Sequence, residues 1–121
     1  MAKIIIVEDE AIVAMENRMN LSAAGHTILA IVSTGKDAID AFDKNLPDLI
    51  LMDIKLRGEM DGIEAMNIIR EKSNTPVVFL TGNSDLKTKQ RLKEISNSSC
   101  LQKPILTKEI VSEVKKMLLN N

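Results

Sequence analysis

The sequence is poor in the residues that mark several common classes of protein. Its single cysteine allows no disulfide within the chain, so nothing indicates an oxidising compartment. It has no tryptophan and no tyrosine, which leaves no large exposed aromatic anchor. No run of about 20 apolar residues occurs, so we expect no transmembrane helix. The apolar run before Glu8 is too short for a signal peptide, and the cytoplasm is therefore the expected location.

Charge of either sign is not in excess. The 16 lysine and arginine residues nearly cancel the 17 aspartate and glutamate residues, which gives a net charge of -1. Proteins that bind nucleic acid normally carry a basic excess or a basic stripe, so we expect no direct nucleic-acid binding. With 121 residues, 45% of them apolar, the chain has the size of one domain with its own core. We therefore expect a single domain over residues 1–121 and no second folded module.

Short apolar runs alternate with helix-period segments five times along the chain. The runs are mostly continuous and rich in β-branched residues, which is typical of strands covered on both faces. The expected strands cover residues 3–7, 27–32, 48–52, 77–80 and 98–102. This alternation predicts an α/β fold with right-handed crossovers. We expect a doubly wound, five-stranded parallel sheet of the flavodoxin-like (βα)5 type, with strand order 2-1-3-4-5.

Local signals mark the ends of several helices. Gly25 is expected to end the first helix, because glycine tolerates the left-handed conformation that follows a helix. Thr34 is expected to cap the second helix. Asp61 and Glu64 have the spacing of a capping box and are expected to start the third helix. These signals support the alternation of strands and helices independently of the apolar pattern.

The expected helices differ in how firmly they can pack. The helix over residues 11–24 places Ile12, Met15 and Met19 on one face, and methionines are expected to fill the core. The helix over residues 85–95 is mostly polar, and its lysine and arginine residues are expected to form a solvated face. Its apolar anchors are three residues: Leu86, Leu92 and Ile95. An element with so few buried contacts can move at low cost.

Chemically active side chains follow four of the five expected strands. Glu8 and Asp9 follow the first strand, Asp53 the third, Thr81 the fourth and Lys103 the fifth. In open α/β sheets, ligands bind beyond the carboxyl ends of the strands, where the strand order reverses. With the first and third strands adjacent, the three carboxylates would converge in one crevice. Such carboxylates repel one another unless a cation or a proton lies between them.

The residue types at these strand ends favour a magnesium site that handles phosphate. A site lined by carboxylate oxygens, with few protein ligands and room for water, suits Mg²⁺. A phosphoryl group could then enter together with the metal, Thr81 could donate a hydrogen bond to it, and Lys103 could pair with its charge. Metal-assisted phosphoryl transfer onto a carboxylate is one known route of covalent chemistry.

The sequence resembles the receiver domain of two-component response regulators over its whole length. Five short motifs carry the resemblance, each at a strand or helix boundary and in the expected order. They are Val7-Glu8-Asp9-Glu10, Leu51-Met52-Asp53-Ile54, Asp61-Gly62-Ile63-Glu64, Leu80-Thr81-Gly82 and Leu101-Gln102-Lys103-Pro104. Each motif alone is weak, but five in this order identify the chain as similar to that family.

The resemblance implies a role for each residue of the acidic crevice. Asp53 would be the phosphoacceptor and, with Asp9, a ligand of Mg²⁺. Glu8 would reach the metal through water, and the backbone carbonyl of Lys55 would supply a further ligand. The phosphodonor would be a phosphohistidine on a sensor histidine kinase or a phosphotransfer protein. The domain would be a signalling switch that assists its own phosphorylation and dephosphorylation, not an enzyme acting on a separate substrate.

The resemblance also implies how phosphorylation is read out. Thr81 would swing toward the phosphoryl oxygen, and Lys103, joined to Pro104 by a cis peptide bond, would contact the phosphoryl group. The changed surface would lie on the fourth helix, the fifth strand and the fifth helix, where it would regulate an unknown downstream protein. The sequence leaves open the choice between monomer and homodimer, and between a standalone regulator and part of a larger protein. The Met1 start favours the standalone form slightly.

The sequence departs from the family pattern in three respects. Cys100 stands where the family usually has tyrosine or phenylalanine, and we expect it to be a small, half-buried apolar residue. Lys55 and Asn83 occupy positions that tune the lifetime of the phosphoryl group, and neither is an acid that would orient water. Phe42 and Phe79 are the only aromatic residues. Because Cys100 replaces the usual aromatic residue, the aromatic switch of the family is absent.

Three other functions are compatible with parts of the pattern. A flavodoxin-type cofactor site needs a hydroxyl- and glycine-rich loop after the first strand, where this chain has Glu8-Asp9-Glu10. A haloacid-dehalogenase-type phosphatase needs the D-x-D pattern at the same place, and Glu8-Asp9-Glu10 does not match it. Both functions therefore fail on these residues. A pseudo-receiver that is never phosphorylated and only binds proteins is the strongest alternative. The complete acidic set, together with Thr81 and Lys103, argues against it.

Overall fold

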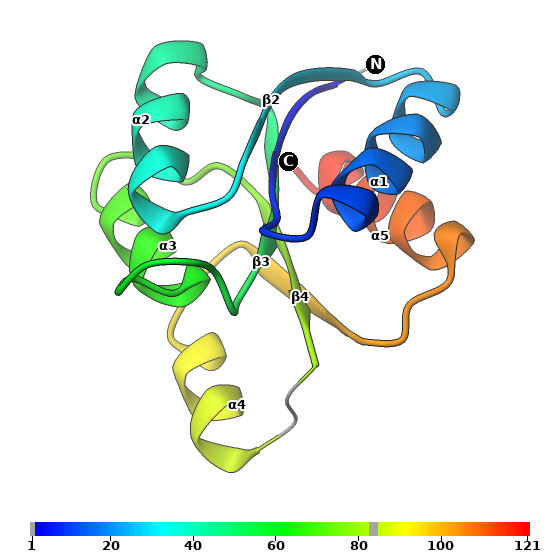
Figure 1. Ribbon diagram of the computed structural model, residues 1–121. Coiled ribbons are helices and arrows are strands. Elements are labelled where there is room, and N and C mark those ends of the chain that lie inside the picture. Colours follow the sequence, from blue (N-terminus) through cyan, green and yellow to red (C-terminus); the bar gives the residue numbers. More distant parts are fainter. Residues whose placement is uncertain (1, 83–84) are drawn as a thin grey trace.

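The structure is a computed structural model that describes residues 2–82 and 85–121. Strands and helices alternate along the chain (Figure 1). The order is β1 (Lys3–Val7), α1 (Ala11–Ala23), β2 (Thr27–Val32), α2 (Gly35–Asn45), β3 (Leu49–Asp53), α3 (Gly62–Arg70), β4 (Val77–Thr81), α4 (Leu86–Lys93), β5 (Ser98–Gln102) and α5 (Thr107–Leu119). No helix in the described part of the chain is both long and apolar enough to cross a bilayer.

The five strands form one parallel sheet in the order β2-β1-β3-β4-β5, as the sequence predicted. Every residue of β3 and β4 is buried, whereas β5 lies at an edge and is partly exposed. β3 and β4 each extend one residue further than predicted, so that Asp53 and Thr81 are the last residues of their strands. The predicted fold class and strand order are confirmed.

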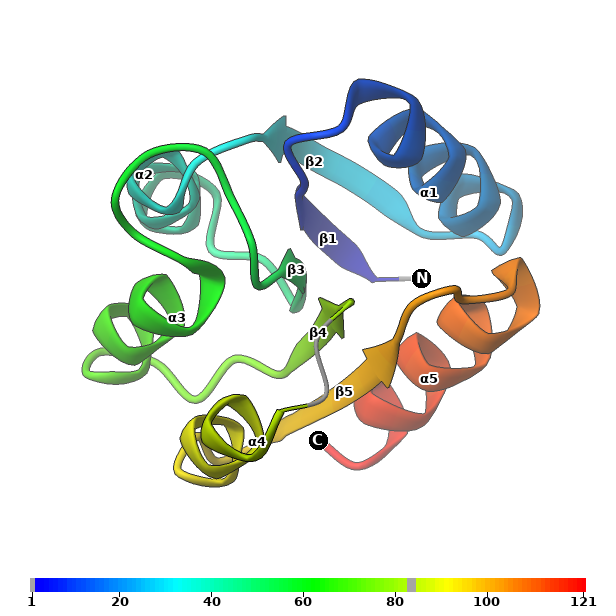
Figure 2. The ribbon, with the colours of Figure 1, turned by 60° about the horizontal axis from the view of Figure 1, so that its bottom comes forward.

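Helices cover both faces of the sheet (Figure 2), and each layer has its own core. Helices α2 and α3 pack on one face, against strand residues that include Ile5, Ile50 and Phe79. Helices α1 and α5 pack on the other face, against the alternate residues, such as Leu51 and Val78. This period of two is what a strand buried on both faces requires. The sheet thereby fixes the positions of the strand ends at its carboxyl edge.

The local helix signals are confirmed. The Thr34 hydroxyl accepts a hydrogen bond from the Asp37 backbone N–H at 3.0 Å. Asp61 and Glu64 form a reciprocal capping box at the start of α3, with N–H to carboxylate distances of 2.8 and 3.0 Å. Gly25 follows α1 with a φ of 96°, the left-handed conformation expected there.

The predicted inner face of α1 is wrong. Ile12, Met15 and Met19 are 76%, 50% and 67% exposed, and a different set faces the sheet and α5: Ala14, Asn17 and Leu21. The helix carries two interleaved stripes of residues along its length. The stripe that contains the small Ala14 faces inward, where the helix lies close to the sheet. Periodicity alone does not decide between such stripes, because the entry angle of the helix does. The expectation that methionines fill the core consequently fails for Met15 and Met19.

Two expectations near α4 also need correction. Leu86 is 71% exposed and anchors nothing, whereas Leu92 packs against the core and Ile95 is buried just after the helix. Cys100 is exposed rather than half-buried. Leu101 faces the core on the α5 side of β5, so Cys100 points to the opposite face. That face is poorly covered because β5 is an edge strand and α4 packs loosely.

Candidate functional site

The residues predicted to converge at the carboxyl edge of the sheet do so. Asp53 ends β3 and pairs with Leu80 in the neighbouring strand, so Asp53 and Thr81 leave the sheet side by side. The backbone N–H of Lys103 donates to the carbonyl of Thr81 at 2.7 Å, which ties the end of β5 to the end of β4. Glu8 follows β1, and its backbone N–H donates to the carbonyl of Val32 in β2 at 2.9 Å. Hydrogen bonds between neighbouring strands thus place these four residues at one edge.

Two buried carboxylates share one ammonium group at the centre of the site. Glu8 and Asp53 are each 3% exposed. Lys103 Nζ donates to Asp53 Oδ2 at 2.9 Å and lies 3.9 Å from Glu8 Oε1. Buried carboxylates are stable only when they are paired or protonated, and one lysine cannot fully compensate two of them. The site therefore has an excess of negative charge.

The pKa values reflect this excess. Burial, followed by the neighbouring carboxyl of Asp53, raises the pKa of Glu8 from 4.5 to about 8. The backbone N–H of Glu10, which donates to Glu8 Oε2 at 3.2 Å, and the charge of Lys103 act in the opposite direction but do not cancel the rise. Burial alone would lower the pKa of Lys103, yet its hydrogen bond to Asp53 and the surrounding carboxylates raise it overall. A second cation would relieve the same imbalance.

The carboxylates beside this pair fit a divalent cation. Oxygen atoms of Glu8, Asp9 and Glu10 lie within 4.8 Å of one another. Glu8 Oε1 is buried and has no hydrogen-bond partner among the described residues. A set of hard carboxylate oxygens, one of them buried without a hydrogen bond, is the donor chemistry that Mg²⁺ takes. Glu10 was not among the predicted metal residues, although its position directly after Asp9 was a usable signal.

Asp53 is held from behind by the start of α3. The N–H of Gly62 donates to the carbonyl of Ile54 at 2.7 Å. A Cβ at position 62 would overlap the carbonyl oxygen of Asp53, so only glycine allows this approach. The connection between β3 and α3 is therefore packed directly onto the backbone of the predicted phosphoacceptor, which fixes its position.

An ion pair joins this connection to α4. Arg91 contacts both carboxylate oxygens of Asp61, with Nη1 2.9 Å from Oδ2 and Nη2 3.1 Å from Oδ1. The hydrogen bond and charge of Asp61 raise the pKa of Arg91 despite partial burial. The sequence placed Arg91 in a solvated face and did not predict this pair, because the partners are far apart in the chain. Asp61 thus caps α3 and holds α4 at the same time.

Two further details concern the predicted site. The peptide bond between Lys103 and Pro104 is cis, as the family resemblance implied. Lys55 is exposed beyond β3, and its role as a metal ligand stays a prediction. Asn83, predicted to influence phosphoryl lifetime, lies outside the described residues.

Comparisons with known proteins show to which family the chain belongs. The sequence matches the response regulator receiver domain over residues 4–115. The signal receiver domain of a modulated diguanylate cyclase from Desulfovibrio desulfuricans superposes with a TM-score of 0.90 at 28% identity, covering 99% of this chain and 95% of that one. The N-terminal domain of a response regulator/sensory box/GGDEF protein from Carboxydothermus hydrogenoformans gives 0.86 at 31% identity, covering 98% and 94%. A putative response regulator from Chloroflexus aurantiacus gives 0.88 at 29%, covering 98% of each chain. The chain belongs to the response regulator receiver domain family.

Proposed function

We propose that this domain is a phosphorylation-controlled switch in which Asp53 accepts a phosphoryl group. The observation that carries the proposal is the buried pair at the end of β3: Asp53 is 3% exposed and lies 2.9 Å from Lys103 Nζ. A carboxylate held in this way is a fixed nucleophile beside a cation that can follow the incoming charge. The donor would be a phosphohistidine on a sensor histidine kinase or a phosphotransfer protein.

The transfer step needs few groups from this chain. A carboxylate oxygen of Asp53 forms a bond to phosphorus while the bond from phosphorus to the histidine nitrogen breaks, and the imidazole keeps that electron pair. The ammonium of Lys103 can pair with a phosphoryl oxygen, and the hydroxyl of Thr81, which ends the neighbouring strand, can donate to another. The domain assists a reaction on itself and acts as a signalling element rather than as an enzyme with a separate substrate.

A magnesium ion is part of the proposal. Glu8, Asp9 and Asp53, with the backbone carbonyl of Lys55, would hold it, and Glu10 lies close enough to contribute. When bound, the ion supplies positive charge between the carboxylates and the phosphoryl oxygens. The buried Glu8 Oε1, which has no hydrogen-bond partner among the described residues, supports this assignment, because ion binding would satisfy it. The raised pKa of Glu8 marks the same shortage of positive charge.

The proposed output surface is formed by α4, β5 and α5, and phosphorylation would change it to regulate a downstream protein. Thr81 ends β4, and the chain then leads to α4, in which none of the residues, all of them described, is buried. A hydroxyl that moves toward the phosphoryl group would pull on this weakly packed helix. Since Cys100 is exposed and small, the proposal assigns the movement to α4 itself rather than to a side-chain rotor on β5. The proposed compartment is the cytoplasm, since a lone cysteine needs no oxidising environment.

Incubation with acetyl phosphate and Mg²⁺ tests the proposal. Intact mass measurement should show the addition of one phosphoryl group to the parent chain and none to Asp53→Asn. The matched control is Asp40→Asn, an exposed aspartate on α2, which should label like the parent. Labelling of Asp53→Asn would show that the acceptor is another residue. No labelling of the parent by acetyl phosphate or by any phosphohistidine donor would favour the pseudo-receiver alternative.

A further inference from the structure

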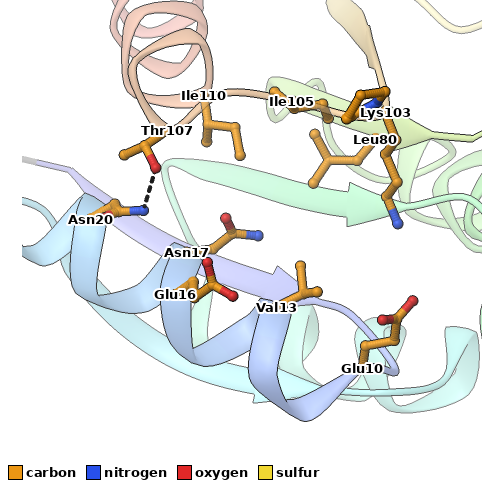
Figure 3. A pocket seen from close by; sticks show the side chains of 11 residues that line it. Glu10, Val13, Glu16, Asn17, Asn20, Leu80, Lys103, Ile105, Thr107 and Ile110 are labelled. Carbon is orange, nitrogen blue, oxygen red and sulfur yellow. Dashed lines mark hydrogen bonds between the residues drawn. The ribbon is translucent and has the colours of Figure 1, made fainter.

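A cavity of about 280 Å³ lies beside the acidic site, between α1 and the segment that leads from β5 into α5 (Figure 3). Lys103 lines the cavity and also holds Asp53, so the cavity and the proposed phosphoacceptor share one side chain. The cavity is roughly nine times the volume that one water molecule takes in the liquid, and it lies just below the size range of drug-sized sites. It is large enough for a small organic molecule.

The cavity contains a buried amide with an unused donor. Asn17 is 5% exposed, and its Nδ2 has no hydrogen-bond partner among the described residues. Figure 3 shows this amide pointing into the space between α1 and the side chains of Ile105 and Ile110. The nearby Asn20 differs, because its amide donates to the Thr107 hydroxyl at 3.2 Å and closes one end of the cavity. An unpaired buried donor is costly, so Asn17 favours any occupant that brings an acceptor.

The side chains at the walls and at the mouth of the cavity indicate which further chemical groups an occupant can have. Four branched aliphatic side chains give the cavity an apolar wall: Val13, Leu80, Ile105 and Ile110. Glu10 and Glu16 contribute exposed carboxylates at the mouth, while the charge of Lys103 is engaged by Asp53. The surroundings therefore repel an anion and offer an apolar surface to a short aliphatic body.

We propose that this cavity binds a small uncharged aliphatic amide, whose carbonyl oxygen accepts a hydrogen bond from Asn17 Nδ2. The amide nitrogen of such a ligand can in turn donate to Asn17 Oδ1, because a primary amide pairs with another primary amide through both atoms. The aliphatic part lies against Val13 and Ile110. Because Lys103 lines the cavity and also holds Asp53, we assign the cavity the role of an effector site. The effector role rests on the function proposed above, whereas the binding itself does not.

Titration of the isotope-labelled full chain, followed by NMR, tests the binding. Isovaleramide should shift the side-chain amide signals of Asn17 and the methyl signals of Ile110 in a saturable way, and the Ile110 signals report binding in every variant. Isovalerate has the same carbon skeleton but is an anion, and it should bind about tenfold more weakly because the carboxylates at the mouth repel it. Equal affinities for isovaleramide and isovalerate, or no saturable shift with isovaleramide, would overturn the proposal. Ordered water would then be the occupant of the cavity.

Two variants separate the contact from the fold. Asn17→Leu should weaken isovaleramide binding by about tenfold, because the donor is lost. It should melt no lower than the parent, since it removes a buried unpaired group. If Asn17→Leu does not fold, Val13→Phe, which fills the cavity from its wall, should abolish binding instead. Ile12→Ala, on the outward face of the same helix, is the control and should bind normally. Unchanged binding by Asn17→Leu, or by Val13→Phe, would contradict the site.

The coupling has its own readout. Bound isovaleramide should change the rate at which acetyl phosphate labels the parent, and this rate should not respond in Asn17→Leu. If the parent binds isovaleramide but never accepts a phosphoryl group, the proposed function fails while the cavity site stands. If labelling proceeds and binding is absent, the cavity proposal alone fails. If both occur but the rate does not respond, the cavity is a binding site and its effector role is wrong.

Discussion

Helices α3 and α4 follow neighbouring strands, yet they are attached to the sheet in opposite ways. Five of the nine residues of α3 are buried, and its first residue, Gly62, packs on the carbonyl of Asp53. By contrast, all residues of α4 are described and none is buried. The difference assigns two roles to one edge of the sheet. The side that carries Asp53 is held rigidly, and the side that follows Thr81 leads to an element that can move at low cost.

The ends of α4 are held unequally as well. Arg70, in the last turn of α3, donates to four backbone carbonyls in two nearby loops: Ser73, Thr75, Ser96 and Asn97. Together with the burial of Ile95, these contacts fix the chain just after α4. Nearer its start, Leu86 is 71% exposed. The expected movement of α4 is therefore a pivot about its carboxyl end, with Arg91 and Asp61 as the contact that resists it.

Truncation of one apolar side chain on each helix should give the largest contrast. Met66 in α3 is fully buried, so Met66→Ala should lower the free energy of unfolding by about 2–5 kcal/mol. Leu86→Ala in α4 removes an exposed side chain and should change it by less than about 0.5 kcal/mol. Urea denaturation of both variants measures the difference. Comparable losses would show that α4 is packed as firmly as α3.

Removal of Mg²⁺ should make the free energy of unfolding depend on pH through Glu8, beside Asp53. Without metal, the pKa of Glu8 is about 8 in the folded state and near 4.5 in the unfolded chain. The folded protein therefore keeps this proton up to a higher pH than the unfolded chain does. The free energy of unfolding should consequently fall as pH rises between these values. Above pH 8, Mg²⁺ at a hundredfold excess over its Kd should restore about 2.7 kcal/mol. Melting curves recorded across this pH range measure the change in stability. In Glu8→Gln, stability should not decrease with rising pH in this way. A parent without any response to Mg²⁺ would contradict the metal site.

Two glycines provide a matched test of close packing on the two sides. Gly62→Ala should cost about 1–3 kcal/mol, because its Cβ overlaps the Asp53 backbone and forces α3 outward. Gly82, which follows β4, has open space where a Cβ would lie, so Gly82→Ala should be nearly neutral. Thermal melting of both variants is the measurement. If Gly82→Ala is the more damaging change, the close packing lies at Gly82 and not at Gly62.

The smallest expected effect is the contact between Arg91 and Asp61. Both side chains are about one-third exposed, so a double-mutant cycle with Asp61→Asn and Arg91→Gln should give about 0.2–1 kcal/mol. Asparagine preserves the cap of α3, which isolates the ion pair. High salt should reduce the coupling. A coupling energy of zero at low salt would remove this contact from the account of how α4 is held.

The sequence predicted the strand order, the helix ends at Gly25, Thr34 and Asp61, and the edge of the sheet that holds the site, because each depends on local or periodic patterns. Alternation of strands and helices leads to the parallel sheet, and the sheet brings Asp53 and Lys103 together. The inner face of α1 could not be predicted, since two stripes compete and the angle of the helix selects one. The exposure of Cys100 and the ion pair of Arg91 with Asp61 depend on how α4 packs against the rest of the fold. No local pattern contains that information.

Amide hydrogen exchange with a beryllofluoride mimic of the phosphoryl group tests the central claim most directly. Protection should change across α4, while α3 keeps its protection, and Asp53→Asn should show no response to the mimic. Cys100→Ala should respond like the parent, because the movement does not use the thiol. If Asp53 binds the mimic and the protection of α4 stays the same, α4 is not the moving element. The division of this edge into a rigid side and a mobile side would then be wrong.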